Sequence, residues 1–271
     1  MNHCFQCVTR RKIYILRRKR RPSEYMDPVL LLSLALSCIL IPLPFVLRWW
    51  SGWKNLIFTL GIIILVVGKL VEASLNFPGV SWDLMYVSDP LMMAGAILIF
   101  SRLGGELTGK SAGPDKRMVG GLFLGISFLV IVMFALSFII TGANDWKYSL
   151  VSIVYYTSFL AIGMSYLELG DYHPLAFIGA FFVVASIVVC LGFDAGFWAG
   201  TITEEAYSAA PWWFSYAAQS LAGIFALLAM IARKSVRKIH LAKAKTTQSE
   251  ILIAAGVLIF TFIVIVAMLY G

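Results

Sequence analysis

Long apolar stretches alternate with short polar connections along this chain after residue 27. A bilayer core about 30 Å thick is crossed by a helix of roughly 20 mainly apolar residues. Eight stretches have a suitable length, and they cover residues 28 to 47, 55 to 75, 85 to 103, 118 to 141, 150 to 168, 174 to 193, 211 to 232 and 250 to 270. Because lipid cannot satisfy backbone polar groups, each stretch is predicted to be helical. We therefore expect an all-α integral membrane protein, a bundle of about eight transmembrane helices in a lipid bilayer.

Composition agrees with this class, since 60% of the residues are hydrophobic and 13% are charged. Basic residues gather after the first, third and seventh stretches, at Arg48 and Lys54, at Arg102, Lys110, Lys116 and Arg117, and at Arg233, Lys234, Arg237, Lys238, Lys243 and Lys245. The connections after the second, fourth and sixth stretches are acidic, with Asp83, Asp145, Asp194, Glu204 and Glu205. The positive-inside rule then predicts a plasma-membrane protein whose three basic connections are cytoplasmic.

The amino-terminal segment conflicts with this orientation. Residues 10 to 21 contain eight basic side chains, yet the segment before the first stretch would lie outside the cell. One explanation is that translation begins at Met26, which makes residues 1 to 25 a mis-assigned start. The other is that the tail is cytoplasmic and disordered, and that the first stretch, interrupted by Pro42 and Pro44, enters the membrane without crossing it. Such a tail would bind anionic lipid, and we expect no nucleic acid partner.

The chain divides into two halves of four stretches each, residues 26 to 141 and residues 142 to 271. The segment from Asp27 to Gly79 resembles the segment from Asp145 to Gly196 at an offset of about 118 residues. Both halves would enter the membrane in the same direction, which predicts two parallel four-helix repeats. Chance similarity between apolar helices is the competing explanation.

Lys69, Glu72 and Asn76 lie on one face of the second predicted helix, since they are spaced by three and seven residues. A charged side chain in the membrane costs at least about 2.5 to 3.5 kcal/mol, so we expect this face to point into the bundle and Lys69 to pair with Glu72. The alternative is that Lys69 extends its long side chain to the outer interface.

Two aspartates are further candidates for ligand or ion binding. Asp89 precedes Pro90 about four residues inside the third stretch, a pattern that favours the cap of a helix that begins late. A proton or cation site shared with Glu72 is the alternative. Asp194 lies among Gly192, Gly196 and Gly200, whose spacing predicts close helix packing. A break in the helix that lines a cavity is the other interpretation of this run.

The sequence predicts no catalytic residue, no metal site and no cofactor. His3, Cys4 and Cys7 supply three ligands, whereas a structural zinc site takes four. The stretches lack the paired histidines of a haem site, and no nucleophile stands with a base. Whether the protein is an enzyme stays open, with the residues favouring a negative answer.

Four short motifs resemble those of a known protein family. In order they are Met26-Asp27-Pro28, Phe77-Pro78-Gly79, Asp89-Pro90-Leu91 and Gly95. This order resembles an uncharacterised family of small polytopic membrane proteins from archaea and some bacteria, over residues 26 to 103. The family has a tryptophan and a second proline before the turn and a glycine before Asp-Pro, positions that hold other residues here. The resemblance implies a start at Met26 and assigns no catalytic residue.

These patterns predict a transporter-like protein that handles a small solute, an ion or a proton. Its site would be an outward acidic vestibule of Glu72, Asp89 and Asp194, with Lys69 as the internal counter-charge. The alternative from another class is a non-catalytic accessory subunit that binds other subunits of a larger membrane complex. An enzyme acting on lipid or quinone at the outer interface is the third hypothesis.

Overall fold

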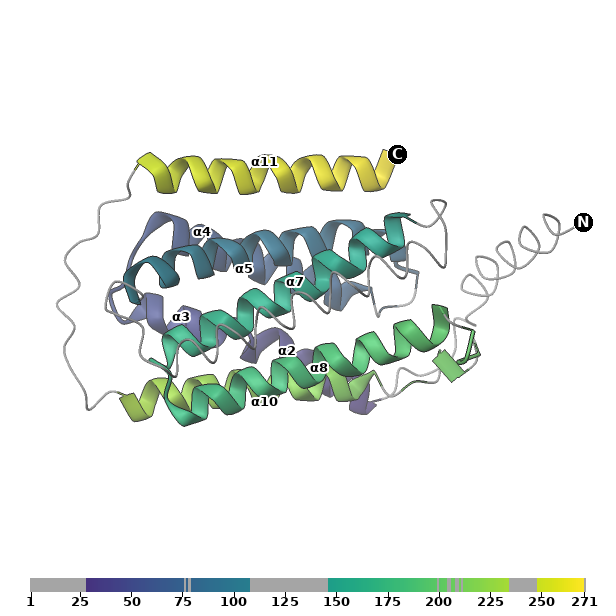
Figure 1. The fold of residues 1–271 in the computed structure, drawn as a ribbon, viewed down its shortest axis with the longest axis horizontal. Helices are drawn as coiled ribbons and strands as arrows, with labels where there is room; N and C mark the ends of the chain where they lie inside the picture. Colours follow the sequence, from purple (N-terminus) through teal and green to yellow (C-terminus); the bar gives the residue numbers. More distant parts are fainter. Residues whose placement is uncertain are drawn as a thin grey trace, which may run out of the picture.

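The computed structural model describes residues 28–75, 77, 79–107, 146–198, 200–203, 206–207, 210, 212–233 and 248–270. Within these ranges the chain is helical and contains no strand. The elements are α2 (Pro28–Leu40), α3 (Leu43–Trp50), α4 (Leu56–Ser74), the 3-10 turn η1 (Trp82–Leu84), α5 (Met85–Leu107), α7 (Trp146–Leu169), α8 (Pro174–Trp198), α10 (Trp213–Arg233) and α11 (Gln248–Tyr270). The helices form an elongated bundle (Figure 1).

Among the residues that the structure describes, six helical segments are long and apolar enough to cross a membrane, which supports a multi-pass membrane protein. They are Pro28–Trp50, Leu56–Ser74, Met85–Leu103, Leu150–Leu169, Pro174–Asp194 and Trp213–Ala232. Each matches one of the eight predicted stretches. The eighth prediction corresponds to α11, whose apolar part, Ala254–Tyr270, is shorter. The fourth predicted span, residues 118 to 141, and the basic tail, residues 1 to 25, lie outside the described residues.

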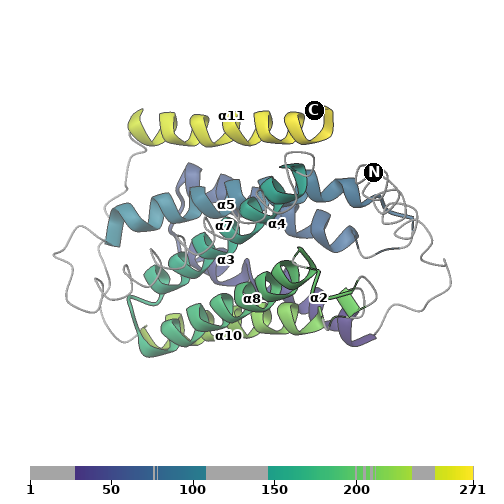
Figure 2. The ribbon, with the colours of Figure 1, turned by 45° about the vertical axis from the view of Figure 1, so that its right-hand side comes forward.

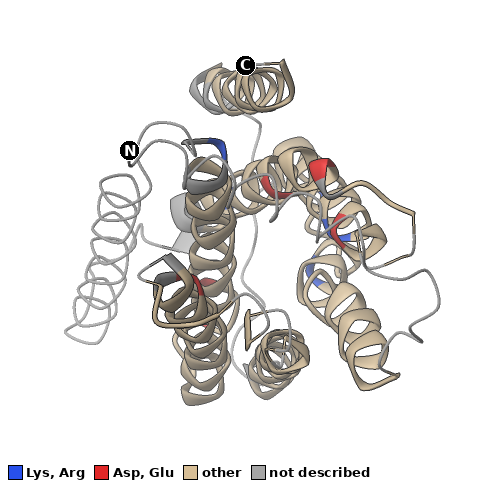
Figure 3. Ribbon diagram, turned by 90° about the vertical axis from the view of Figure 1, so that its right-hand side faces the viewer, with Lys and Arg blue, Asp and Glu red and all other residues tan. Residues whose placement is uncertain are grey.

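Large apolar side chains cover much of the outer surface of this bundle, as a lipid environment requires. In Figure 2, α11 lies along the outside of the bundle, where it packs on α5 and α4. Its side chains Leu252, Ile259 and Phe262 point away from these helices and are exposed. Charged residues are few on the helices in the end-on view of Figure 3.

The first predicted stretch folds as two helices. The interruption falls at Ile41 and Pro42, and α3 carries Pro44 in its first turn. Backbone N–H groups in the first turn have no partner within the helix, so a proline there costs no hydrogen bond. Asn55 then caps α4, because its side-chain oxygen accepts hydrogen bonds from the backbone N–H groups of Ile57 and Phe58.

Small residues bring two pairs of helices into close contact. A side chain on Gly61 of α4 would meet the backbone of Gly95 of α5 at 3.0 Å. A side chain on Gly179 of α8 would meet the backbone of Ala222 of α10 at the same distance. The interface between α4 and α5 is the most extensive in the described bundle, and that between α8 and α10 is among the most extensive. Backbone approach at small residues is the usual way in which membrane helices associate.

The glycine run around Asp194 does not have the predicted packing role. Among the described residues, a side chain added to Gly192 or Gly200 would meet nothing within 4 Å, and one on Gly196 would meet Ile202 in the loop that follows. The prediction of close helix packing there is therefore wrong. The alternative of a broken helix is also wrong, since α8 continues through Asp194 to Trp198.

The two ends of the bundle can be distinguished by the residues that lie there. At one end α4 and α8 finish while α5, α7 and α10 begin; here Met85 at the start of α5 packs against a buried cluster that includes Val151 near the start of α7. We call it the acidic end, because Glu72, Asp89 and Asp194 lie in the adjoining turns. The charge pattern predicts that this end faces outward.

Aromatic side chains fill the core toward the opposite end. Phe45 of α3 stacks on Tyr166 near the end of α7, with ring centroids 5.4 Å apart, and meets the edge of Phe58 at the start of α4. The Tyr166 hydroxyl donates a hydrogen bond of 2.8 Å to the backbone oxygen of Ile41. We call Phe45, Phe58 and Tyr166 the aromatic layer; all three are fully buried.

A tight turn joins α7 to α8 at this opposite end. Asp171 and Tyr172 adopt left-handed backbone angles, with φ of 51° and 59°. The Tyr172 hydroxyl donates a 2.8 Å hydrogen bond to Glu168, a buried carboxylate rather than a solvated one. Burial raises the pKa of Tyr172, and the hydrogen bond to Glu168 raises it further.

Candidate functional site

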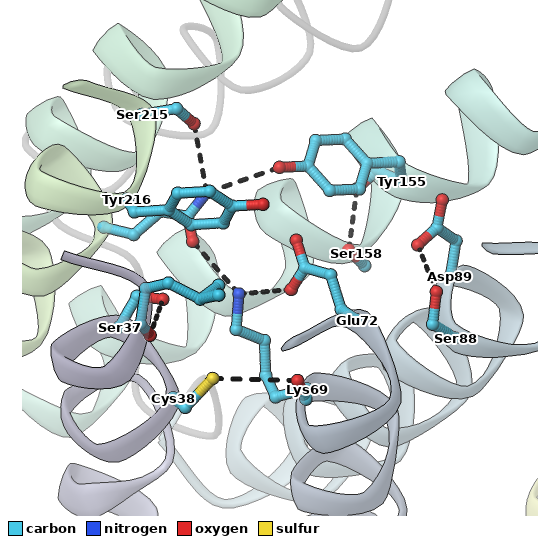
Figure 4. Close-up of polar contacts among 12 residues, drawn as sticks. Ser37, Cys38, Lys69, Glu72, Ser88, Asp89, Tyr155, Ser158, Ser215 and Tyr216 are labelled. Atoms are coloured by element: carbon cyan, nitrogen blue, oxygen red, sulfur yellow. Dashed lines mark hydrogen bonds and ion pairs between the residues drawn. The ribbon is translucent and has the colours of Figure 1, made fainter. Parts of the chain in front are cut away.

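Lys69 and Glu72 form a buried ion pair near the acidic end of α4. The Nζ atom of Lys69 donates to Oε2 of Glu72 one turn later in the same helix (Figure 4). Lys69 is 0% exposed and Glu72 is 5% exposed. The predicted ion pair is therefore confirmed, and the alternative in which Lys69 extends to the interface is wrong. The lysine points into the bundle because its charge is satisfied there by several partners.

Three residues from other helices complete the surroundings of the lysine ammonium group. Gln219 of α10 accepts a hydrogen bond from Nζ through Oε1 at 3.2 Å. The rings of Phe159 and Tyr216 lie 5.6 and 5.4 Å from Nζ, within the range of cation–π attraction. A carboxylate, an amide oxygen and two ring faces thus replace the water that a charged ammonium group loses on burial.

The amide of Gln219 is oriented by this contact. An ammonium group can only donate hydrogen bonds, so the amide oxygen faces Lys69 and the amide nitrogen faces away. Nε2 lies 3.2 Å from the Ser215 hydroxyl, 3.4 Å from the Ser186 hydroxyl and 3.3 Å from the Tyr155 hydroxyl. The lysine charge therefore polarises the amide, which strengthens the hydrogen bonds between the amide nitrogen and this group of hydroxyls.

This group continues along the interface between α8 and α10. The hydroxyls of Ser186 and Ser215 lie 2.7 Å apart, and the Cys190 thiol lies 3.4 Å from the Ser215 hydroxyl. Ser186 and Cys190 are four residues apart on one face of α8, and Ser215 and Gln219 are four residues apart on one face of α10. We call these four buried residues the polar seam.

Asp89 lies inside α5, close to the ion pair. It is buried, it accepts a 2.9 Å hydrogen bond from the Ser88 hydroxyl, and it interacts electrostatically with Glu72 and Lys69. The prediction that Asp89 caps a late-starting helix is wrong, because α5 already begins at Met85. Pro90 lies inside α5, where its missing N–H removes one backbone hydrogen bond of the helix.

Asp194 belongs to a second group, near the end of α8. Its two carboxylate oxygens accept hydrogen bonds from the Tyr156 hydroxyl at 2.5 Å and the Tyr207 hydroxyl at 2.7 Å. Tyr207 comes from the loop after α8, and its ring packs against Phe197 and Trp212. Asp194 therefore ties this loop to α7.

The structure thus divides the predicted vestibule residues. It brings Glu72 and Asp89 near Lys69, and it places Asp194 among tyrosines, one helical turn beyond the polar seam on α8. Asn76 lies outside the described residues. Sequence reasoning missed Ser186, Ser215 and Gln219, although polar residues recurring every fourth position in apolar helices were a usable signal.

Comparison with known proteins adds no further assignment. The sequence matches no family model, and no curated protein and no solved structure matches it. The resemblance of residues 26 to 103 to an uncharacterised family therefore stays a prediction.

Proposed function

We propose that this chain is a transporter-like membrane protein that binds protons or small cations at the Lys69–Glu72 pair, with Asp89 as a second carboxylate. The observation that carries the proposal is a fully buried lysine, ion-paired inside helices that are otherwise long and apolar. Ionisable side chains at such positions mark ion pathways and proton relays in membrane proteins.

Energetics favour a function for this pair over a purely structural role. Two apolar side chains of similar volume often replace a buried ion pair with no loss of stability, or with a gain of about 1 to 4 kcal/mol. Glycine-mediated packing between α4 and α5 already holds this part of the bundle together. The charges of Lys69 and Glu72 are therefore not needed to build the fold.

The charge balance of the group indicates what it would bind. Lys69 contributes one positive charge, and Glu72 and Asp89 contribute one negative charge each when ionised. Uptake of one proton or one monovalent cation by the two carboxylates would neutralise the group. Binding would also weaken the ion pair, because the Glu72 carboxylate would then interact with the bound proton or cation as well as with Lys69. The Lys69 ammonium group would keep its hydrogen bond to Gln219.

Flux measurements in proteoliposomes test this proposal. A potassium diffusion potential set up with valinomycin would drive protons into the vesicles, and an enclosed pH-sensitive dye would report the fall in internal pH. Parallel assays would follow Na⁺ uptake. We expect flux through the unaltered protein and its loss in Glu72→Gln. Asp83→Asn is the matched control, since Asp83 is an exposed carboxylate outside the group.

A second variant protects the test against misfolding. Lys69→Met combined with Glu72→Leu removes both charges and retains the volume, so it should keep the elution profile of the unaltered protein while losing flux. Flux of neither protons nor Na⁺ in the unaltered protein would overturn the proposal and favour the accessory subunit. Unchanged flux in the folded double variant would overturn it as well.

A further inference from the structure

We propose that the polar seam is the route by which water and small cations reach the Lys69–Glu72 pair from the acidic end, with Asp194 at its entrance. This inference rests on the proposed function, and it assigns a role to Ser186, Cys190 and Ser215, which that function does not use.

The first argument is the continuity of the polar contacts. From Lys69 the contacts run to Gln219 at 3.2 Å, from Gln219 to Ser215 at 3.2 Å, and from Ser215 to Cys190 at 3.4 Å. Each step joins side chains within hydrogen-bonding distance, so water entering between α8 and α10 would find a donor or an acceptor at every step.

The second argument is the charge at the far end of these contacts. Asp194 follows Cys190 by four residues on the same face of α8 and interacts with it electrostatically. A carboxylate at the mouth of a narrow path, surrounded by apolar walls, raises the local concentration of cations. Tyr155 and Tyr156, which are adjacent in α7, contact Gln219 and Asp194 respectively, so the seam and Asp194 both lie against α7.

The third argument is that the described residues pack tightly in the opposite direction. Beyond Lys69, the aromatic layer fills the core, and the hydroxyl of Tyr166 is turned onto the backbone oxygen of Ile41. A side chain on Gly223 of α10 would collide with the backbone of Leu40, so α2 and α10 also meet without a gap there. The ion pair is therefore connected by polar groups to one end of the bundle and separated from the other by aromatic rings.

Helix association is the competing explanation of the seam, because Ser and Gln side chains often join membrane helices by hydrogen bonds. The two explanations differ in what they require. Hydrogen bonds that only hold helices together need no water, whereas a route must admit water and cations when α8 and α10 separate transiently. Because the seam is buried in this conformation, the rate at which a small cation enters is the quantity to measure.

Cys190 is a natural reporter for that rate. Replacing Cys4, Cys7 and Cys38 with alanine leaves Cys190 as the single thiol of the chain. Ag⁺, a small cation that reacts with thiols, would be added to one side of oriented proteoliposomes, and the remaining thiol would be labelled with a fluorescent maleimide after denaturation. The loss of label measures how far the reaction with Ag⁺ has proceeded.

The matched control moves the thiol off the seam at nearly the same depth. Leu191→Cys, with Cys190→Ala in the same background, places it one residue later on α8, roughly 100° around the helix, at a buried, apolar position. We expect Cys190 to react about tenfold faster than this control, from the acidic end only, and to slow several-fold in Asp194→Asn, because the entrance charge no longer concentrates the cation.

The outcomes separate this inference from the proposed function. Equal rates at the two thiol positions, or faster reaction from the opposite end, would overturn the route even when Glu72→Gln still abolishes flux. Rapid reaction of Cys190 in a protein without flux would support the route and overturn the proposed function. An unreactive Cys190 in a protein with normal flux would show that cations reach the pair by another path.

Discussion

The polar seam and the aromatic layer are equally well buried and chemically opposite. Both are built between helices near the core, yet the seam offers hydroxyl, thiol and amide groups, while the aromatic layer offers rings and one hydroxyl that is already bonded to the backbone. Burial therefore does not distinguish a path from a barrier in this bundle. The distinction lies in whether adjacent buried groups can pass hydrogen bonds to one another.

The same contrast explains the position of the ion pair between the two regions. Lys69 is near the acidic end of α4, where the seam supplies Gln219 as an acceptor; the aromatic layer begins on the other side. A charge placed among the rings of the layer would meet no comparable set of acceptors, and its cost would be correspondingly higher. The ion pair thus lies between the polar seam and the aromatic layer.

The largest expected effect comes from a substitution in the ion pair beside the polar seam. Glu72→Ala leaves the Lys69 ammonium group buried without its carboxylate, and we expect a loss of about 3 to 5 kcal/mol in the free energy of unfolding. Unfolding in detergent micelles, followed by circular dichroism, measures it. The double variant with Lys69→Met and Glu72→Leu should recover most of this loss. A single variant as stable as the unaltered protein would contradict a charged, buried pair.

The next prediction concerns a substitution in the aromatic layer. Phe45→Ala removes a fully buried ring that contacts Tyr166 and Phe58, and large-to-small changes of this kind cost about 3 kcal/mol or more. The cavity would also thin the barrier, so we expect proton leak through proteoliposomes to rise. Trp50→Ala is the control, because Trp50 lies in the same helix and is exposed. If the Phe45→Ala protein were as stable as the unaltered protein and showed no added proton leak, the aromatic layer would not be a barrier.

How far the sequence anticipates this arrangement depends on the kind of feature. Apolar length predicts six of the helices, because the thickness of a bilayer fixes the span of a helix in advance. The three-residue spacing of Lys69 and Glu72 predicts their ion pair for a similar reason, since both lie in one helix. That the two four-helix halves are parallel repeats of each other stays a prediction.

Features that depend on contacts between helices are those that the sequence does not predict. Asp89 was expected to cap a helix, but the chain before it already forms η1 and the start of α5. Gln219 meets Lys69 across 150 residues of sequence, and no local pattern specifies that encounter. The glycine spacing around Asp194 matches a packing motif, yet a side chain added to Gly192 would meet no described atom within 4 Å. Tertiary placement decides these cases.

The smallest effects come from a matched pair of tyrosine hydroxyls, one on each side of the ion pair. Tyr155→Phe removes the hydroxyl that Gln219 contacts at 3.3 Å, and Tyr166→Phe removes the hydroxyl bonded to Ile41. Hydrogen bonds between membrane helices contribute on average about 0.6 kcal/mol, so both variants should fold and unfold almost as the unaltered protein does. Their stabilities, measured by unfolding in micelles, should differ by less than about 1 kcal/mol.

Their effects on flux should nevertheless diverge. Tyr155→Phe removes a polar contact of Gln219 beside the seam, so cation entry should slow, and the reaction of Cys190 with Ag⁺ should slow in parallel. Tyr166→Phe leaves the rings of the aromatic layer in place, so neither rate should change. Equal slowing by both substitutions would mean that the two ends do not differ in access, because loss of a hydroxyl would then act through general loosening of the bundle. A change confined to Tyr155→Phe would instead tie entry to the chemistry of the acidic end.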